Sequence, residues 1–272
     1  MQDDTIKSSV IYADLRGDLQ TVERRGEIMR EGKLRLLEPE PVVVTEHLTK
    51  RFQSVTALDD ISLSIPEGRI IGMVGPNGSG KSTFLKILAG LYAEYGGEVR
   101  ICGHKPSAAT KAVTAYLPDK PGIPYDCTPE DAIKIYEGFF RDFDTEQCRE
   151  MLKLFDIKET APVKEMSKGV VDKLQICLLM ARKARLYLLD EPIGGVDIAA
   201  RDHVLDIILE EFNPGATMII VTHLISEIER LFDSVIVLKN GKVEAFRDSD
   251  SIRMQYGTLE EGLKEIFAGR EI

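Results

Sequence analysis

A nine-residue segment, GPNGSGKST at residues 75–83, constrains the fold and chemistry of this chain more than any other part of its sequence. It matches the pattern G-x-x-x-x-G-K-[S/T], in which glycines let backbone N–H groups turn inward around an anion. The segment lies between an apolar run at residues 70–74 and an amphipathic run at residues 84–89. Strand, glycine loop and helix in this order predict a phosphate-binding loop rather than a turn that binds nothing.

The residue types in this loop suit a bound triphosphate. A helix that begins near Lys81 directs the positive end of its dipole at the anion. We expect Lys81 to reach the β- and γ-phosphates and the Ser82 hydroxyl to hold Mg²⁺. The predicted nucleotide-binding residues are Gly75, Pro76, Asn77, Gly78, Ser79, Gly80, Lys81, Ser82 and Thr83.

The composition excludes other classes of function. The chain has 272 residues, 43% of them hydrophobic, and a net charge of −10. Such an acidic chain lacks the basic face that non-specific nucleic-acid binding needs, so we expect no nucleic-acid partner. No apolar run approaches the ~20 residues that span a bilayer, and no signal peptide is evident, which predicts a cytoplasmic protein. The dispersed cysteines predict free thiols rather than a zinc site.

Regular secondary structure is expected from residue 41 onward. Residues 1–40 mix charges of both signs and hold few large apolar residues, which is typical of a mobile arm or a short helix over residues 19–30. Binding to a partner stays an alternative role for this arm. Runs rich in β-branched residues then predict strands at residues 42–45, 61–65, 70–74, 97–102 and 112–117.

A helical insert is predicted over residues 119–165. Thr128 as a cap, Pro129 at the first helical position and Asp131 two residues later mark the start of one helix. A second helix is expected at about residues 145–155, where apolar side chains recur at helical spacing.

The remaining elements alternate buried runs with turn signals. Continuous apolar runs at residues 186–190 and 218–222 are typical of parallel strands buried on both faces. An Asn-Gly turn at residues 240–241 predicts a hairpin. Residues 259–267 read as a short amphipathic helix.

Two carboxylates stand at the carboxyl end of the run LYLLDE, residues 186–191. Open α/β sheets bind their ligands at this edge. We expect Asp190 to hold Mg²⁺ directly or through water, and Glu191 to deprotonate the water that attacks the γ-phosphate. A solvated acid pair that merely ends a strand is the alternative, and the upstream phosphate loop disfavours it.

With these motifs in place, the sequence closely resembles the ATP-binding subunit of an ATP-binding-cassette (ABC) transporter, most of all the bacterial exporter type. Residues 75–83 and 186–191 are similar to its Walker A and Walker B motifs, and MSKGV at residues 166–170 is similar to its LSGGQ signature. GGVD at residues 194–197 resembles the D-loop, and His223 after a buried strand resembles the switch histidine.

The resemblance implies an α/β fold. Its parts are a P-loop NTPase core of mostly parallel sheet, an antiparallel β subdomain, and a helical subdomain that carries the signature. On this basis we expect an N-terminal extension at residues 1–40, an ATPase domain at 41–248 with its helical subdomain at about 119–182, and a short helical tail at 249–272.

The resemblance also implies further site residues. Phe52 would stack on adenine, although an aromatic at this place also serves as an ordinary core residue. Ser167 and Gly169 would meet the γ-phosphate held by a second subunit, although Ser167 is also explained as a simple helix cap. Asp197 would belong to the nucleotide site, and His223 would hold the γ-phosphate, the water and Glu191 in register, although a lone histidine after a strand is more often structural.

Three positions depart from the family's pattern. Lys168 replaces the first glycine of the signature, and Val170 replaces its glutamine. Asp119 lies where the family has the Q-loop glutamine; an acid there still suits Mg²⁺ or water, while its part in coupling to transport is in doubt. Because Ser167 and Gly169 are retained, we expect ATPase activity to survive.

The first hypothesis is therefore an ATPase that forms a dimer around two ATP–Mg²⁺ and drives a separate membrane permease, with the subunit bound to the inner face of the membrane. One alternative is a cassette ATPase that acts on a membrane complex without transport. Another is an ATP sensor with little hydrolysis, which Glu191 disfavours because a degenerate site lacks the base.

Overall fold

The computed structural model describes residues 27–30, 33–36, 41–120, 122–213 and 215–269. The chain divides into two compact units, Met1–Pro39 and Glu40–Ile272. Within the first unit, β1 (Glu27–Arg30) pairs antiparallel with β2 (Lys33–Leu36). The predicted helix over residues 19–30 is therefore wrong for Glu27–Arg30, where pairing with a neighbouring strand prevails over local helical propensity; residues 19–26 lie outside the described residues.

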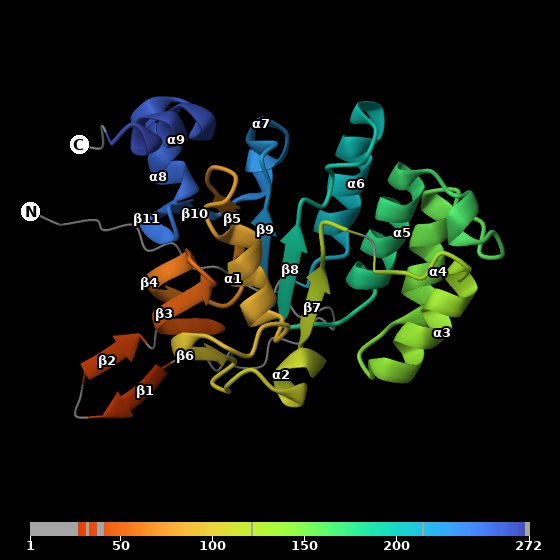
Figure 1. Ribbon diagram of the computed structural model, residues 1–272, viewed down its shortest axis with the longest axis horizontal. Helices are drawn as coiled ribbons and strands as arrows, with labels where there is room; N and C mark the ends of the chain where they lie inside the picture. The colour runs from red at the N-terminus through yellow and green to blue at the C-terminus, as the bar shows by residue number, and fades with distance from the viewer. Residues whose placement is uncertain (1–26, 31–32, 37–40, 121, 214, 270–272) are drawn as a thin grey trace, which may run out of the picture. The chain divides into compact units, whose positions relative to one another are not determined.

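A six-stranded sheet forms the centre of the second unit (Figure 1). Its order is β11-β10-β5-β9-β8-β7, and all neighbours are parallel except the β10–β11 hairpin. Asn240 and Gly241 turn this hairpin with φ angles of 51° and 76°, as the Asn-Gly pair predicts. The strands are β5 (Ile70–Val74), β7 (Thr114–Leu117), β8 (Leu186–Asp190), β9 (Thr217–Val221), β10 (Ser234–Lys239) and β11 (Lys242–Asp248).

Both faces of this sheet are buried, as the continuous apolar runs predict. In β8, Leu186 and Leu188 face one hydrophobic core, whereas Tyr187 and Leu189 face the other. The same alternation holds in β9. Because parallel strands are covered by helices on both sides, each strand needs apolar residues at every position rather than at every second one.

An antiparallel sheet covers one face. Its order is β4-β3-β6, from β3 (Val43–Phe52), β4 (Val55–Ile65) and β6 (Gly96–Ile101), and it shares a core with α1 (Lys81–Leu88). The strands predicted at residues 42–45 and 61–65 are the outer parts of a longer hairpin. Polar residues at its exposed positions hid its full length.

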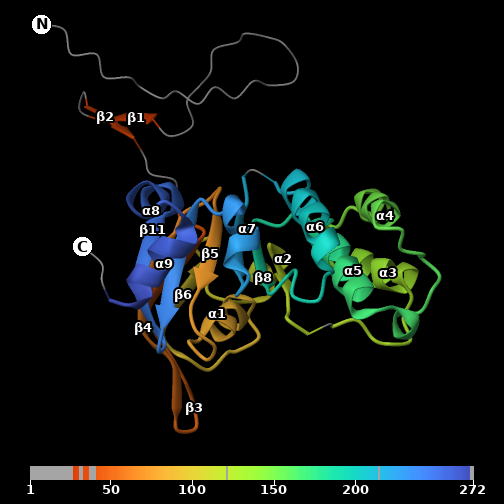
Figure 2. The ribbon, with the colours of Figure 1, turned by 90° about the horizontal axis from the view of Figure 1, so that it is seen from above.

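The helical insert forms its own group, at the end of this unit farthest from the C-terminal helices in both ribbon views (Figure 2). Thr128 Oγ1 accepts a hydrogen bond from the Asp131 backbone N–H, and the Thr128 backbone N–H donates to the Asp131 carboxylate in return, which confirms the predicted helix start. Residues 108–112, of which the last was predicted as strand, form a helix before β7. This helix before β7 is α2 (Ala108–Ala112), and the helices of the group itself are α3 (Pro129–Phe139), α4 (Thr145–Leu154), η1 (Val163–Glu165) and α5 (Lys168–Met180).

The remaining helices follow the last strands of the sheet. They are α6 (Ile198–Glu210), α7 (Ile225–Ile228), η2 (Glu229–Leu231), α8 (Ser249–Tyr256) and α9 (Leu259–Phe267), and the last of these confirms the predicted amphipathic helix. Across the described part of the chain, no helix is both long and apolar enough to traverse a bilayer.

A buried arginine fastens the helical group to the sheet. Arg182, only 2% exposed, donates to both carboxylate oxygens of Asp142, at 2.8 and 3.0 Å. It also donates to the backbone carbonyls of Ala112 and Thr114 at the start of β7, and its guanidinium lies 3.8 Å from the ring centroid of Phe140. One cation therefore joins α5, the segment before α4 and the edge of the sheet.

Replacing Asp142 by Ala should lower the free energy of unfolding by about 3–5 kcal/mol, because it leaves a buried guanidinium without its counter-charge. Chemical denaturation followed by circular dichroism measures this change. The control is Lys264→Ala, which removes the exposed Lys264–Glu260 pair on α9 and should leave the denaturation midpoint where it is. Equal midpoints for the two variants would contradict the role given to Arg182.

Candidate functional site

The loop of residues 75–83 joins β5 to α1, in the strand–loop–helix order that the sequence predicts. Gly80 precedes the helix with φ 105°, and a Cβ there would lie 2.3 Å from the carbonyl oxygen of Ala57 in β4. A Cβ at Gly75 would lie 2.0 Å from the carbonyl oxygen of Leu238 in β10. Only glycine fits at these two places, so the shape of the loop is set by backbone from both sheets.

Lys81 curls over the loop to which it belongs. Its Nζ donates to the carbonyl oxygens of Gly75 at 2.8 Å and Pro76 at 3.1 Å. Burial lowers the pKa of the Lys81 ammonium, while Glu191 and Asp190 act in the opposite direction. The buried Ser79 Oγ has no hydrogen-bond partner among the described residues. A buried cation and an orphaned hydroxyl in one loop suit an anionic ligand with many oxygens.

The Ser82 hydroxyl donates to Asp190 Oδ1 at 3.1 Å, so the two predicted metal-binding residues are brought together. Adjacent ligands of an octahedral Mg²⁺, each ~2.1 Å from the ion, lie ~3 Å apart, so this pair fits the ion. Asp190 is 2% exposed, and burial raises its pKa despite the hydrogen bond from Ser82.

The described residues hold no cluster of three or more His, Cys, Asp or Glu side chains suited to a metal. Mg²⁺ in nucleotide sites uses one or two protein ligands, water and the substrate phosphates. The Ser82–Asp190 pair therefore fits a magnesium ion that arrives with a nucleotide, and not a permanent all-protein metal cage.

Glu191 and His223 form a second pair, at the carboxyl ends of the adjacent strands β8 and β9. His223 Nδ1 lies 2.8 Å from Glu191 Oε2, and the His223 backbone N–H donates to the same oxygen at 3.3 Å. Glu191 has φ 55°, in the left-handed region that non-glycine residues rarely adopt, while its own N–H donates to Val221 O at 2.8 Å. This backbone turn directs the carboxylate toward the end of β9.

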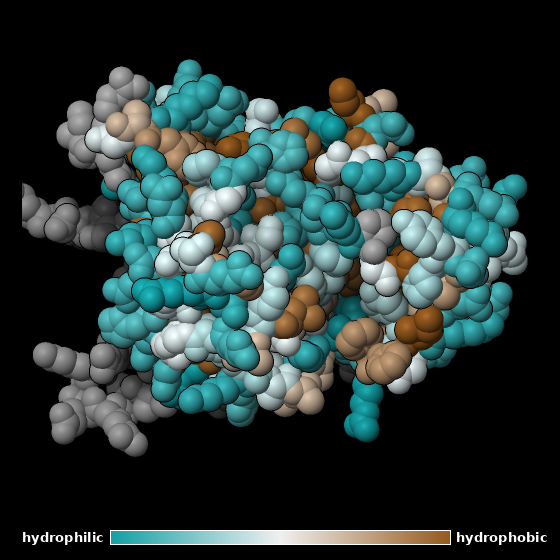
Figure 3. All heavy atoms as spheres, viewed as in Figure 1, coloured by the Kyte–Doolittle hydropathy of each residue, from teal (hydrophilic) through white to brown (hydrophobic). Residues whose placement is uncertain are grey.

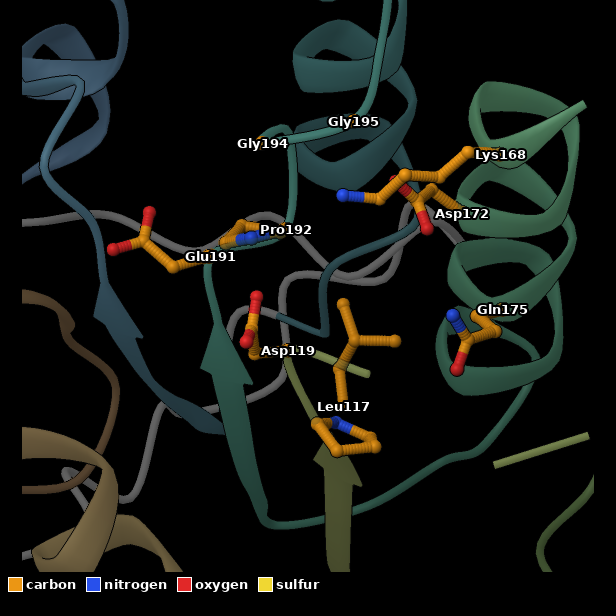
Figure 4. Close-up of a pocket in the computed structure, with 10 residues that line it drawn as sticks. Leu117, Asp119, Lys168, Asp172, Gln175, Glu191, Pro192, Gly194 and Gly195 are labelled. Atoms are coloured by element: carbon orange, nitrogen blue, oxygen red, sulfur yellow. The ribbon is translucent and has the colours of Figure 1, made fainter. Parts of the chain in front are cut away.

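Asp119 follows β7 and lies between the end of β8 and α5 in Figure 4. It lines a small pocket together with Glu191 and the residues Lys168, Asp172 and Gln175 of α5. Its charge helps to raise the pKa of Asp190 and of Asp172, although burial is the larger cause for both. The predicted Q-loop position is thus next to the acidic site, and the three residues of α5 were not anticipated from the sequence.

Phe52 lies at the end of β3, 38% exposed, so it is not an ordinary core residue. Its ring packs edge-on against Tyr92, with centroids 5.4 Å apart, and Lys50 Nζ lies 4.9 Å from the Phe52 centroid. Tyr92 and Lys50 were missed in the sequence analysis. The alternation of β3 places Lys50 on the same side as Phe52, which was the available signal.

The signature residues lie on the helical group. Ser167 caps α5 and accepts a hydrogen bond from the Val170 N–H at 3.3 Å, as predicted. A Cβ on Gly169 would lie 3.1 Å from the carbonyl oxygen of Gly195, so α5 begins directly against the loop of residues 194–197. Asp197 precedes the first residue of α6.

Comparison with known proteins agrees with this arrangement. Residues 58–194 match the family model described as ABC transporter. An uncharacterized ABC transporter ATP-binding protein of Methanocaldococcus jannaschii is 33% identical over 229 residues, covering 81% of this chain and 82% of that protein. An uncharacterized ABC transporter ATP-binding protein of Bacillus subtilis, YdbJ, is 32% identical, covering 76% of this chain and 69% of that protein.

A solved structure described as an ATP binding subunit of an ABC transporter has the same fold, with a TM-score of 0.75 and 25% identity. The match covers 84% of this chain and 99% of that one. A P-loop NTPase core, an antiparallel sheet and a helical group are thus shared between them. The chain belongs to the ABC transporter family, as an ATP-binding subunit with ATPase activity.

Proposed function

We propose that this chain forms a dimer around two ATP–Mg²⁺ and uses their hydrolysis to drive a separate membrane permease. The observation that carries the proposal is the pair of Glu191 and His223, 2.8 Å apart at the edge of the sheet where Ser82 and Asp190 also meet. Two adjacent carboxylates with different partners support two different roles, one for a metal ion and one for a water.

Binding of the nucleotide rests on the loop of residues 75–83 and on Phe52. Inward N–H groups and the start of α1 hold the phosphates, and Lys81 exchanges its carbonyl partners for phosphate oxygens. The half-exposed ring of Phe52, with Tyr92 at its edge, offers a flat face for adenine. Ser79 Oγ gains a phosphate partner that it lacks within the described chain.

Ser82 and Asp190 would hold the magnesium ion, with Asp119 as a further oxygen donor directly or through water. Bound there, Mg²⁺ would neutralise negative charge on the β- and γ-phosphates.

Glu191 acts on the attacking water. Its carboxylate accepts the water's proton as the water oxygen approaches the γ-phosphorus, and the bond to the bridging oxygen of ADP breaks. His223 orients this carboxylate through Nδ1 and its backbone N–H, and its exposed ring is available to contact the γ-phosphate of a bound ATP. The general base and its orienting group thus come from two neighbouring strands.

A second subunit completes each site. Ser167 and Gly169 at the start of α5 present N–H groups and the positive end of a helix, which suit the γ-phosphate of an ATP held by the other subunit. Asp197 lies on the same surface, beside Ile198, which is 80% exposed. An apolar residue so exposed next to a site motif supports an interface there.

The permease would dock on the helical group. A groove next to α3 is lined by apolar residues that include Leu91, Ile135 and Tyr136. Phe139 on α3 is 80% exposed, and Figure 3 shows apolar side chains gathered over α3 and the adjacent surface. We propose that this groove takes a helix of the permease, which places the subunit in the cytoplasm, on the inner face of the membrane.

We assign the parts of the chain from these proposed roles. We propose residues 1–40 as an extension, 41–248 as the ATPase domain with a helical subdomain at about 119–182, and 249–272 as a helical tail. Export is the proposed direction. It rests on the Ser-Lys-Gly signature at residues 167–169 alone, since the relatives include both a manganese transport system ATP-binding protein of Bacillus subtilis and a Nod factor export ATP-binding protein of Ralstonia nicotianae.

Replacing Glu191 by Gln should leave ATP affinity unchanged, reduce turnover at least about 100-fold, and stabilise an ATP-bound dimer, because the base is lost while the phosphate contacts remain. Phosphate release and light scattering measure the two effects. Glu244→Gln, on the exposed side of β11, is the control. Turnover at the wild-type rate in Glu191→Gln would remove Glu191 from the role of base.

Replacing Lys81 by Ala should weaken ATP binding at least about tenfold, because a charge-assisted contact to phosphate is lost. Titration with a fluorescent ATP analogue measures the affinity, and Lys134→Ala on the surface of α3 is the matched loss of one charge. Normal affinity in Lys81→Ala would contradict the phosphate contact.

Replacing Phe139 by Asp should abolish co-purification of a multi-span membrane protein without changing the basal ATPase rate, because it puts a charge at the edge of an apolar groove. Affinity capture from detergent extracts of native cells tests this. Met254→Asp on α8, where Met254 is 87% exposed, is the control. Capture of the same partner by the Phe139→Asp protein would place the docking surface elsewhere.

A further inference from the structure

Arg201, in the first half of α6, contacts both the segment that follows Glu191 and the segment that follows His223. Its Nε donates to the carbonyl oxygen of Val196 at 3.1 Å. Its NH1 lies 2.6 Å from each carboxylate oxygen of Glu227, in α7. Neither Arg201 nor Glu227 belongs to the motifs that the sequence analysis singled out.

The contact with Val196 holds the segment that follows Glu191. From Glu191 to Val196 the chain is a compact series of turns, in which Gly194 N–H donates to Glu191 O and Val196 N–H donates to Ile193 O. Val196 is 3% exposed. These two hydrogen bonds and the burial of Val196 couple the position of Val196 to the backbone of Glu191.

The contact with Glu227 holds the segment that follows His223. Leu224 N–H donates to Thr222 Oγ1, and α7 begins at Ile225, so few free torsions separate His223 from Glu227. The contacts therefore close a ring: Glu191 to Val196 along the chain, Val196 to Arg201, Arg201 to Glu227, Glu227 back to His223, and His223 to Glu191.

The ion pair of Arg201 and Glu227 is more buried than ordinary surface ion pairs. The side chains of Arg201 and Glu227 are 17% and 35% exposed. Arg230 and Asp206 link the same region of α6 to the segment after α7, but they are 50% and 54% exposed and make no recorded contact with Val196. Partial desolvation strengthens the Arg201–Glu227 pair, and three hydrogen-bond contacts fix the direction of the guanidinium.

We propose that Arg201 is a positioning residue for hydrolysis, which sets the distance between Glu191 and His223 by joining the loop of residues 194–197 to α7. The inference rests on the proposed roles of Glu191 and His223. It also links the loop that faces a second subunit with the His223 segment. Closure of the dimer against residues 194–197 would therefore adjust the catalytic pair through Arg201.

The test compares Arg201→Gln, Glu227→Gln and the double variant in the full chain with Mg²⁺ and ATP. Each single variant should lower kcat roughly tenfold to a hundredfold, the range that misplacement of reacting groups by about 1 Å produces. ATP affinity should stay at the wild-type value, because neither residue touches the loop of residues 75–83. The double variant should be no slower than the slower single variant, because both changes open the same ring.

Arg201→Lys keeps the charge opposite Glu227 but lacks the fork that also reaches Val196, so its kcat should fall between those of the wild type and Arg201→Gln. Arg230→Gln is the matched control and should keep the wild-type kcat. An unchanged kcat in Arg201→Gln and Glu227→Gln, additive losses in the double variant, or an equal loss in Arg230→Gln would each overturn the proposal.

Glu191→Gln, measured in the same series, separates this inference from the proposed function. If Glu191→Gln stops turnover and the Arg201 variants do not slow it, only the positioning role fails. If Glu191→Gln itself turns over normally, the proposed catalytic pair fails, and the role of Arg201 fails with it.

Discussion

The contact of the loop at residues 75–83 with the backbone of two different sheets is the constraint on which the rest of the site depends. Gly80 lies against β4, and Gly75 lies against the end of β10. The phosphate loop is therefore not a free turn at the end of β5. It is shaped by the antiparallel sheet on one side and the parallel sheet on the other. The position of Ser82, which contacts Asp190, therefore depends on both sheets.

Much of the fold was readable from the sequence because its signals are local. The loop at residues 75–83, the caps Thr128 and Ser167, and the Asn-Gly hairpin each depend on short-range chemistry, and the structure confirms them. The full length of β3 and β4 was not predicted, because the halves of these strands next to their shared turn carry exposed polar residues. The segment Glu27–Arg30 was read as part of a mobile arm or a short helix, because it becomes a strand only by pairing with β2, which begins three residues further on.

The parts of the site that escaped prediction are those that tertiary contacts create. Arg182 and Arg201 look like ordinary helix residues in the sequence, yet each joins segments that are far apart along the chain. The first ties the helical group to the sheet, and the second ties the segment after Glu191 to the segment after His223. Spacing along the sequence carries no signal of either, since their partners at residues 142 and 227 are placed only by the fold.

The left-handed backbone at Glu191 lowers the stability of the fold at the position whose side chain is proposed as the general base. Gly or Asn adopts a φ of 55° at less cost than Glu, so a residue chosen for folding alone would not be a glutamate. A carboxylate is kept where the backbone disfavours it, which indicates that its side chain is needed for what it does. With Glu191 in its proposed role, variants that relax this strain would gain thermal tolerance as they lose the reaction, so a screen for heat resistance would select against catalysis here.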